Sequence, residues 1–276
     1  MKITVFALCL LITLLIRTSI AYSQADNLIL YVSDQDGNRE IYTMSPDGSN
    51  RQRLTTNTNE DTEPAWSPDR SQIAFSSNQD GNFAIYIMNA DGSNAQRVSP
   101  ENRGSFHSSP AWSPTEDRIA YVSNASGVNQ IHTIRVDGEE DTPLTAQRFE
   151  SLDPSWSPDG RIIAFTSNPN GNYEIFSMTS SGQGARGLTV DSTVDSDSPA
   201  WSPDGTLIAF AANGGSGEIY VMNADGSNVR LLTSAANSFA GSPTWSPDGQ
   251  TIAYALQGRG VEPSIRSVSI DGFSLL

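Results

Sequence analysis

The side chains that could carry acid–base, nucleophilic or metal chemistry are few in this chain. Two histidines and one cysteine occur in 276 residues. His132 stands in an apolar pair with Ile131, which is typical of a core strand, whereas His107 precedes a tryptophan segment and is the freer of the two. One histidine without a His or Cys companion does not make a strong zinc site, although it could act as a lone general base.

A nucleophile motif and a calcium loop were the other chemical alternatives. Gly214-Gly215-Ser216-Gly217 only approximates a nucleophile elbow and is interpreted as a turn. The segment SDQDGN places Asp34, Asp36 and Asn38 at alternate positions, as calcium ligands are placed. No distant glutamate is in register to complete that loop, and a later copy, SNPNGN, keeps the turn without the acids. We therefore expect no cofactor, no metal and no enzymatic activity, with Asp34, Asp36 and Asn38 as the calcium alternative.

The first 21 residues have the layout of a secretory signal peptide. Lys2 precedes an apolar run from Ile3 to Ile16, and Ser19 and Ala21 supply small residues for cleavage. The alternative is an uncleaved anchor, but the apolar run is shorter than the ~20 residues that span a bilayer. We expect a periplasmic or secreted protein without membrane insertion after cleavage. Cys9 lies in this segment, so the mature chain would contain no thiol or disulfide.

The mature chain is strongly acidic. Removal of the signal takes Lys2 and Arg17 from the 16 basic residues and leaves all 31 acidic ones, so the formal net charge is −17. Such a surface repels nucleic acid and anionic lipid. It is compatible with solubility alone or with a basic partner.

Five tryptophans mark an internal repeat. Each occurs in a segment Pro-x-Trp-Ser-Pro, and the spacings between them are 46, 44, 45 and 44 residues. An Ile-Ala-aromatic triplet follows seven residues later, and then an apolar pair, an Asp-Gly turn and a Leu-Thr-like segment. The tryptophans are Trp66, Trp112, Trp156, Trp201 and Trp245.

The repeat predicts an all-β, six-bladed β-propeller with about 45 residues per blade. Its short apolar segments, separated by Ser-Pro-Asp-Gly and Asp-Gly turns, are typical of four strands per copy, and such copies bury their faces by stacking in a ring. We expect the tryptophans to be structural and to wedge between blades. The predicted organisation is a signal peptide at 1–21 and one propeller at 22–276, with repeats at 22–65, 66–111, 112–155, 156–200, 201–244 and 245–276.

The two terminal repeats are predicted to be incomplete. The first lacks a proper tryptophan strand, because Tyr22 stands in that register. The last has its turn at Asp271-Gly272, so its Leu-Thr strand is expected near position 278, beyond Leu276. We therefore expect the last blade to lack most of its outer strand.

The repeat resembles the WD40-like PD40 repeat of the TolB propeller family. The phrases that carry this resemblance are P-x-W-S-P-D-G-x-x-I-A-F, I-Y-x-M-N-A-D-G-S-N and R-L-T, and they cover nearly all of the mature chain. The resemblance implies an exported propeller that binds a lipoprotein in the envelope, or a relative of propeller-bearing peptidases and oligogalacturonate lyases. The α/β domain of TolB and the hydrolase domain of the peptidases have no counterpart in this sequence, so fold carries over more safely than function.

The candidate binding site lies where the copies differ. The loops before each Pro-x-Trp vary most, and if the tryptophan strand is innermost they surround one mouth of the channel. Acids and aromatics on one rim suggest a recognition surface for a protein or peptide, and the acids favour a basic partner. We expect the propeller to bind it as a monomer. The alternative is that the phenylalanines pack the top of the channel. The candidate rim residues are Glu60, Phe106, His107, Phe149, Glu150, Asp195 and Phe239.

Three functions remain open from the sequence. The first is a non-catalytic propeller that binds a protein or peptide partner in the cell envelope through the channel mouth. The second is an enzyme that acts on polysaccharide, related to the propeller lyases. The third is a purely structural or docking propeller.

Overall fold

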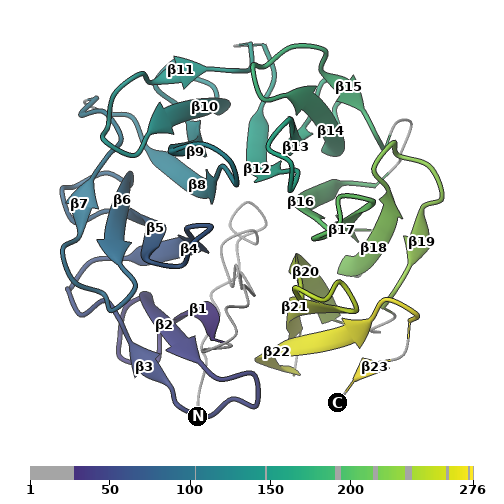
Figure 1. The fold of residues 1–276 in the computed structure, drawn as a ribbon, viewed down its shortest axis with the longest axis horizontal. Coiled ribbons are helices and arrows are strands. Elements are labelled where there is room, and N and C mark those ends of the chain that lie inside the picture. The colour runs from purple at the N-terminus through teal and green to yellow at the C-terminus, as the bar shows by residue number, and fades with distance from the viewer. Residues whose placement is uncertain are drawn as a thin grey trace.

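In a computed structural model, the chain forms six β-sheets arranged as blades around a central channel (Figure 1). The structure describes residues 28–102, 104–146, 148–189, 194–213, 217–233, 238–258, 261–272 and 274–275. The predicted signal peptide and Tyr22 lie outside these residues. All regular elements in the described ranges are strands, so the predicted all-β, six-bladed propeller is confirmed.

Each blade is an antiparallel sheet whose strands follow one another in chain order from the channel outward. The bounds of the strands in blades 1 to 3 are β1 (Ile29–Ser33), β2 (Glu40–Met44), β3 (Gln52–Arg53); β4 (Asp61–Trp66), β5 (Gln72–Ser77), β6 (Ala84–Asn89), β7 (Gln96–Arg97); β8 (His107–Trp112), β9 (Arg118–Ser123), β10 (Gln130–Arg135) and β11 (Thr142–Pro143). Those in blades 4 to 6 are β12 (Ser151–Trp156), β13 (Ile162–Ser167), β14 (Glu174–Thr179), β15 (Arg186–Gly187); β16 (Ser196–Trp201), β17 (Leu207–Asn213), β18 (Gly217–Asn223), β19 (Arg230–Leu231); β20 (Ser238–Trp245), β21 (Thr251–Gly258), β22 (Val261–Ser269) and β23 (Ser274–Leu275).

The tryptophan strand is the innermost strand of blades 2 to 6, and the tryptophan ends it. The inner strand begins five residues before the tryptophan in blades 2 to 5 and seven residues before it in blade 6, so a repeat counted from the tryptophan divides the inner strand. Every inner strand also has a bulge before its proline, as between Thr62 and Ala65 opposite β5. The residue that precedes the proline has a positive φ, 51° at Glu63 and 54° at Ser109. Proline has no N–H to give to the ladder, and a bulge accommodates that loss.

The Ser-Pro-Asp-Gly turns join the inner strand to the second strand as predicted. In blade 4, the Ser157 hydroxyl donates to Asp159 Oδ1 at 2.6 Å and accepts from the Ile162 N–H at 3.0 Å. Gly160 has a φ of 71°, which a glycine adopts without strain. The serine and aspartate thus close the turn with their side chains, which explains why both residues recur.

The tryptophans pack in clusters that are shared by neighbouring blades. Trp112 packs in a cluster that contains Ile85 and Val98 of blade 2 and Ile119 of blade 3. Its Nε1 donates to the carbonyl of Ala65 in the preceding inner strand at 3.0 Å. The equivalent bonds from Trp156 to Ala111 and from Trp245 to Ala200 measure 3.1 and 3.0 Å.

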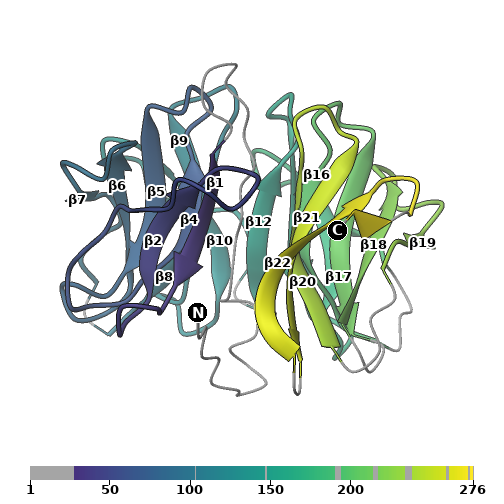
Figure 2. The same ribbon diagram turned by 90° about the horizontal axis from the view of Figure 1, so that it is seen from below.

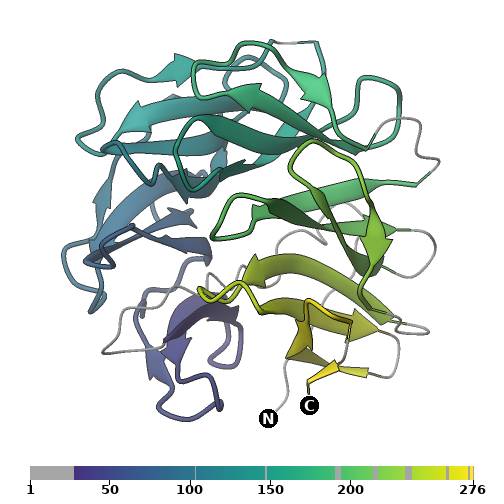
Figure 3. The same ribbon diagram turned by 45° about the vertical axis from the view of Figure 1, so that its right-hand side comes forward.

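Blades 1 and 6 lie side by side and close the ring (Figures 1 and 3). Tyr31 and Tyr42 of blade 1 belong to a buried cluster against which Ala255 and Ile265 of blade 6 pack. The side view in Figure 2 shows the blades standing along the channel axis. Blade 1 has three strands in the described residues, because β1 takes the place of a second strand and no inner strand precedes it there.

The prediction that blade 6 lacks most of its outer strand is wrong. β23 pairs with β22, with Ser274 opposite Val268 and Leu275 opposite Ser267. The outer strands of the other blades are also only two residues long and end before the Leu-Thr-like pair, as β19 ends at Leu231. Blade 6 therefore needs no residue near position 278 to complete its sheet.

Candidate functional site

The channel has one end lined by prolines and tryptophans. A cavity of about 410 Å³ lies among the ends of the inner strands and the turns that follow them. Its lining includes Pro64, Trp66, Trp112, Pro154, Trp201 and Pro243. The candidate rim residues lie at the opposite end of the same strands, where each inner strand begins.

The backbone of the rim is fixed by a repeated asparagine. The N–H of the residue six positions before the tryptophan donates to an asparagine Oδ1, from Glu60 to Asn78 at 2.8 Å and from Phe106 to Asn124 at 2.7 Å. Glu150 donates to Asn168 in the same way at 3.0 Å. Because these main-chain groups are held in three blades alike, their side chains can differ without a change of fold.

Two of the rim phenylalanines present their rings to solvent. Phe106 and Phe239 are each 39% exposed and are two of the four large exposed hydrophobic residues in the described chain. Phe149 is half-buried, and the Arg148 guanidinium lies 5.2 Å from the centre of its ring. The rim thus offers apolar surface at blades 3 and 6.

The acids of blades 4 and 5 gather around Tyr173, a residue that sequence reasoning missed. Its backbone N–H donates to Asp195 Oδ1 at 2.9 Å. Burial, and then the negative charges of Glu150, Asp195 and Asp153, raise the pKa of the Tyr173 phenol. This part of the rim is therefore an electronegative surface. Tyr173 lies in the loop that follows Asn168 and directly precedes β14. This loop position is the sequence signal that could have identified it as a rim residue.

Glu60 is not a free acid of the rim. Its carboxylate forms an ion pair with Arg39 of blade 1, and both side chains are partly exposed. No local sequence pattern indicates this pair, because the two residues lie 21 positions apart in different blades. The acidic rim is thus concentrated at blades 4 and 5.

The prediction that His107 is the freer histidine is wrong, and its side chain is not part of the rim surface. His107 begins β8 and is only 1% exposed. Burial lowers the pKa of its imidazole to about 4, and the ring lies edge-on to Tyr121, with 5.5 Å between the ring centres. His132 is a buried strand residue as predicted, and its Nδ1 lies 2.9 Å from Asp141 Oδ1.

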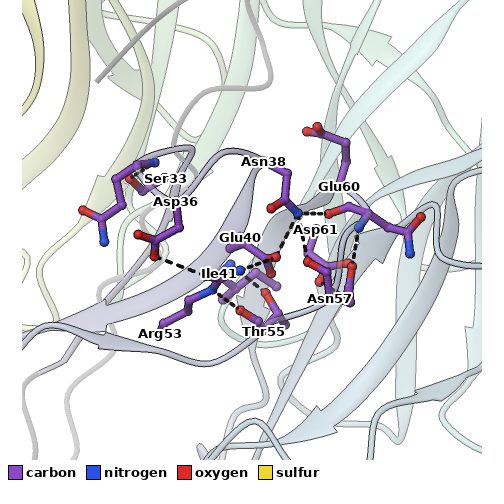
Figure 4. Close-up of polar contacts among 12 residues, drawn as sticks. Ser33, Asp36, Asn38, Glu40, Ile41, Arg53, Thr55, Asn57, Glu60 and Asp61 are labelled. Carbon is purple, nitrogen blue, oxygen red and sulfur yellow. Dashed lines mark hydrogen bonds and ion pairs between the residues drawn. The ribbon is translucent and has the colours of Figure 1, made fainter. Parts of the chain in front are cut away.

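The calcium alternative is not supported by the geometry of blade 1 (Figure 4). Asp36 Oδ2 accepts a hydrogen bond from Arg53 at 3.2 Å. It accepts another from the Tyr42 hydroxyl at 2.6 Å. Asn38 turns its Nδ2, a donor, toward Glu40 Oε1 at 2.8 Å. Within the described residues, no group of three or more His, Cys, Asp or Glu side chains could hold a metal ion.

Next to this region, at the start of β4 in blade 2, lies a buried carboxyl with a shifted pKa. Asp61 is fully buried and accepts a hydrogen bond from Asn57 at 2.6 Å (Figure 4). Burial raises the pKa of the Asp61 carboxyl to about 6, with a further contribution from the charge of Glu40. Arg53 lies 2.7 Å from Glu40 and compensates that buried charge.

Comparison with known proteins assigns the chain to a family. The model of the TolB beta propeller domain matches residues 16–106 and 101–275, and the chain belongs to this family. Among curated proteins, no sequence matches the chain. In the described residues, no helix is long and apolar enough to cross a membrane.

Solved structures of similar fold include TolB proteins and an oligogalacturonate lyase. A TolB candidate from Agrobacterium tumefaciens aligns with a TM-score of 0.70 and 21% identity over 81% of this chain and 82% of that one. TolB from Acinetobacter baumannii aligns with a TM-score of 0.59 and 23% identity over 84% of this chain and 63% of that one. An oligogalacturonate lyase in complex with manganese aligns with a TM-score of 0.64 and 12% identity over 93% of this chain and 90% of that one. Identities this low establish the shared fold alone.

Proposed function

We propose that this protein is an exported, non-catalytic propeller that binds a protein or peptide partner of the cell envelope through the rim. The observation that carries the proposal is the rim itself. It combines exposed rings at Phe106 and Phe239 with an acidic surface at Glu150 and Asp195 on a fixed backbone. Aromatic side chains are enriched at the centres of interfaces, and complementary charge favours association.

The partner surface that fits this rim is basic and partly apolar. The acidic surface around Tyr173 and the overall charge of the chain attract positive side chains, whereas the two phenylalanines need an apolar contact. Export is supported by the signal-like residues 1–21, which lie outside the described part of the chain. A basic, exported protein segment is therefore the expected ligand.

The non-catalytic part of the proposal is supported by the positions of the two histidines. Both are buried in blade 3, and His132 already contacts Asp141. Neither ring is placed to act on a substrate at the rim. Assays for polysaccharide cleavage with and without divalent metal would test this part, and turnover would contradict it.

The test is affinity capture from native envelope extract with the exported protein as bait. We expect one or more partners to be retained by the wild type and reduced at least tenfold by the combined variant Phe106→Ala, Phe239→Ala, Glu150→Gln, Asp195→Asn. Asparagine at 195 keeps an acceptor for the Tyr173 N–H. Retention should also weaken as salt is raised, because exposed charge pairs are screened.

A matched control is available on the outer edge of blade 5. Leu231 lies in the outermost strand β19 and Val229 directly precedes that strand, far from the rim. The two residues are 49% and 51% exposed. Val229→Ala with Leu231→Ala should leave capture unchanged. Equal capture by the rim variant and the wild type would contradict the proposal and favour a structural propeller.

A further inference from the structure

A cluster of oxygen atoms surrounds the side-chain amide of Asn38, between blades 1 and 2 (Figure 4). Asn38 Nδ2 donates to Glu40 Oε1 at 2.8 Å and to the carbonyl oxygen of Asn57 at 3.2 Å, and it also contacts the carbonyl oxygen of Asn59. An amide nitrogen carries two hydrogen atoms, so it does not satisfy three acceptors at once. The oxygens therefore converge on a point where one amide supplies too little positive charge.

Two buried carboxylate oxygens in this cluster have no hydrogen-bond partner. Glu40 and Asp61 are both fully buried. Glu40 Oε2 and Asp61 Oδ1 accept no hydrogen bond, whereas the other oxygen of each group accepts one, from Arg53 and from Asn57. Burial raises the pKa of the Asp61 carboxyl and the charge of Glu40 adds to this effect, so the two groups lie close together. A buried carboxylate oxygen without a partner costs free energy.

The cluster is negatively charged overall. Asp36, Glu40 and Asp61 carry three negative charges when they are ionised. Arg53 carries one positive charge and pairs with both Asp36 and Glu40, at 3.2 and 2.7 Å. The remaining charge of −2 equals the charge that one divalent cation neutralises.

The equivalent position of blade 3 has neutral side chains. Gln130 directly precedes the apolar pair, as Glu40 does in blade 1, and Ser151 lies five residues before its tryptophan, as Asp61 does. Gln130 Nε2 donates to the carbonyl of Phe149 at 2.8 Å, and its Oε1 accepts from a threonine hydroxyl at 2.8 Å. An amide and a hydroxyl therefore satisfy this position, and the fold does not require two acids there.

We propose that the cluster between blades 1 and 2 is a binding site for a calcium ion. Its protein ligands are the carboxylates of Glu40 and Asp61, the carbonyl oxygens of Asn57 and Asn59, and Asn38 Oδ1. A half-turn of the Asn38 amide brings Oδ1 to the place of Nδ2. Calcium takes 6–8 oxygen ligands in flexible geometry, so water completes the set. Only two of the protein ligands are carboxylates, and Asp34 and Asp36 of the SDQDGN segment are not among them.

A calcium ion at this position would join two blades. Asn38 lies in the loop between β1 and β2, and Glu40 begins β2 of blade 1. Asn57 and Asn59 precede β4, and Asp61 begins β4 of blade 2. The ion would hold the rim loop of blade 2 against blade 1, and this role does not depend on the proposed partner binding.

Calorimetric titration of the chelator-treated protein with calcium chloride tests the site. We expect one equivalent of calcium to bind with a Kd of about 0.1–1 mM, the range of exported calcium-binding modules. The melting temperature should rise by at least about 3 °C in about 10 mM calcium, because the ligand binds the folded state alone. Absence of saturable heat up to about 10 mM calcium would overturn the proposal.

A double variant and a matched control locate the binding. Glu40→Gln with Asp61→Ser copies the neutral side chains of blade 3, so it should fold and should bind calcium at least tenfold more weakly. Asp80→Asn should leave calcium affinity unchanged, because Asp80 belongs to the same Gln-Asp-Gly-Asn motif in blade 2, where Ala84 stands in place of Glu40. Equal calcium affinities for the wild type and the double variant would overturn the site.

Asn38→Asp tests the site in the opposite direction. Without calcium it removes the amide donors and adds a negative charge, so the melting temperature should fall. With calcium the added carboxylate becomes a ligand, and calcium affinity should rise about tenfold, because ligand charge tunes the affinity of calcium sites. A loss of stability that calcium does not reverse would contradict the proposal.

Discussion

At the scale of single residues, one position of the repeat shows how the same backbone accommodates different chemistry. The residue five positions before the tryptophan is Asp61 in blade 2, His107 in blade 3, and a serine, Ser151 or Ser196, in blades 4 and 5. All four are buried. Burial raises the pKa of the Asp61 carboxyl and lowers the pKa of the His107 imidazole.

These two groups should give stability opposite dependences on pH. The folded pKa of Asp61 is raised from 3.8 to about 6, so its contribution is lost as pH rises through that interval. The folded pKa of His107 is lowered from 6.5 to about 4, so its contribution is lost as pH falls through that interval. Relative to wild type, the unfolding free energy of Asp61→Ser should rise by about 2 kcal/mol from pH 4 to pH 7, and that of His107→Ser should fall by about 2 kcal/mol.

Denaturation curves at pH 4, 5, 6 and 7 would measure both differences. The comparison uses the change with pH, so any constant cost of the smaller side chain cancels. Parallel curves for a variant and the wild type would show that the corresponding group does not titrate in this range.

The buried tryptophans carry a large share of the packing between blades. Trp156 is almost completely buried among Ala120, Ile163 and Met178 and donates to the Ala111 carbonyl. Trp156→Ala should destabilise the protein by ~3–5 kcal/mol, the usual cost of deleting a large buried aromatic side chain. Phe239→Ala at the exposed rim should cost less than about 1 kcal/mol. Chemical denaturation would check both, and an unchanged midpoint for Trp156→Ala would contradict the wedge.

At the scale of elements, the Asp-Gly turn between the third and outer strands serves the contact between blades as well as the hairpin. A Cβ on Gly92 would lie 2.5 Å from the carbonyl oxygen of Leu54 in blade 1. Gly226 meets Leu188 in the same way, and Gly182 of the equivalent Ser-Gly turn meets Leu144. The glycine is therefore required twice, for its positive φ and for the close approach of the next blade.

Gly92 and Gly48 form a matched pair that separates the two requirements. Both occur in the sequence Asp-Gly-Ser-Asn with φ of 86° and 80°, but a Cβ on Gly48 would meet only the flexible end of Arg51, at 3.8 Å. Gly48→Ala should cost about 1 kcal/mol from the left-handed backbone. Gly92→Ala should cost about 3 kcal/mol, because a main-chain oxygen must also move. Equal losses in urea denaturation would show that the contact between blades gives way without cost.

At the scale of the whole molecule, the ring is closed by side-chain packing between blades 1 and 6. The buried cluster there, which includes Tyr31, Tyr42 and Met44, is the smallest of the six clusters that the described residues form. Amides of β1 to β3 should therefore exchange with solvent at least tenfold faster than those of β12 to β15, because local opening is easiest where contacts are fewest. Hydrogen exchange followed by mass spectrometry would measure this, and equal protection would contradict a weaker closure at blade 1.

Much of the fold could be predicted because it depends on local chemistry that repeats. The spacing of the tryptophans, the Ser-Pro-Asp-Gly turns and the Ile-Ala-aromatic triplets determined the number of blades and the wedge position of each tryptophan. The outer strand of blade 6 could not be placed by counting to its Leu-Thr-like pair, because the two-residue strand precedes that pair.

The sequence by itself determined the propeller, the acidic charge and the loops in which the copies differ. Only the tertiary structure decided which residues of those loops reach solvent. It buried His107 against Tyr121, paired Glu60 with Arg39 of another blade, and brought Tyr173 next to Asp195. The physical reason is range: turns and strand periods depend on neighbours in the chain, whereas burial and charge pairing in a ring depend on the adjacent blade, about 45 residues away.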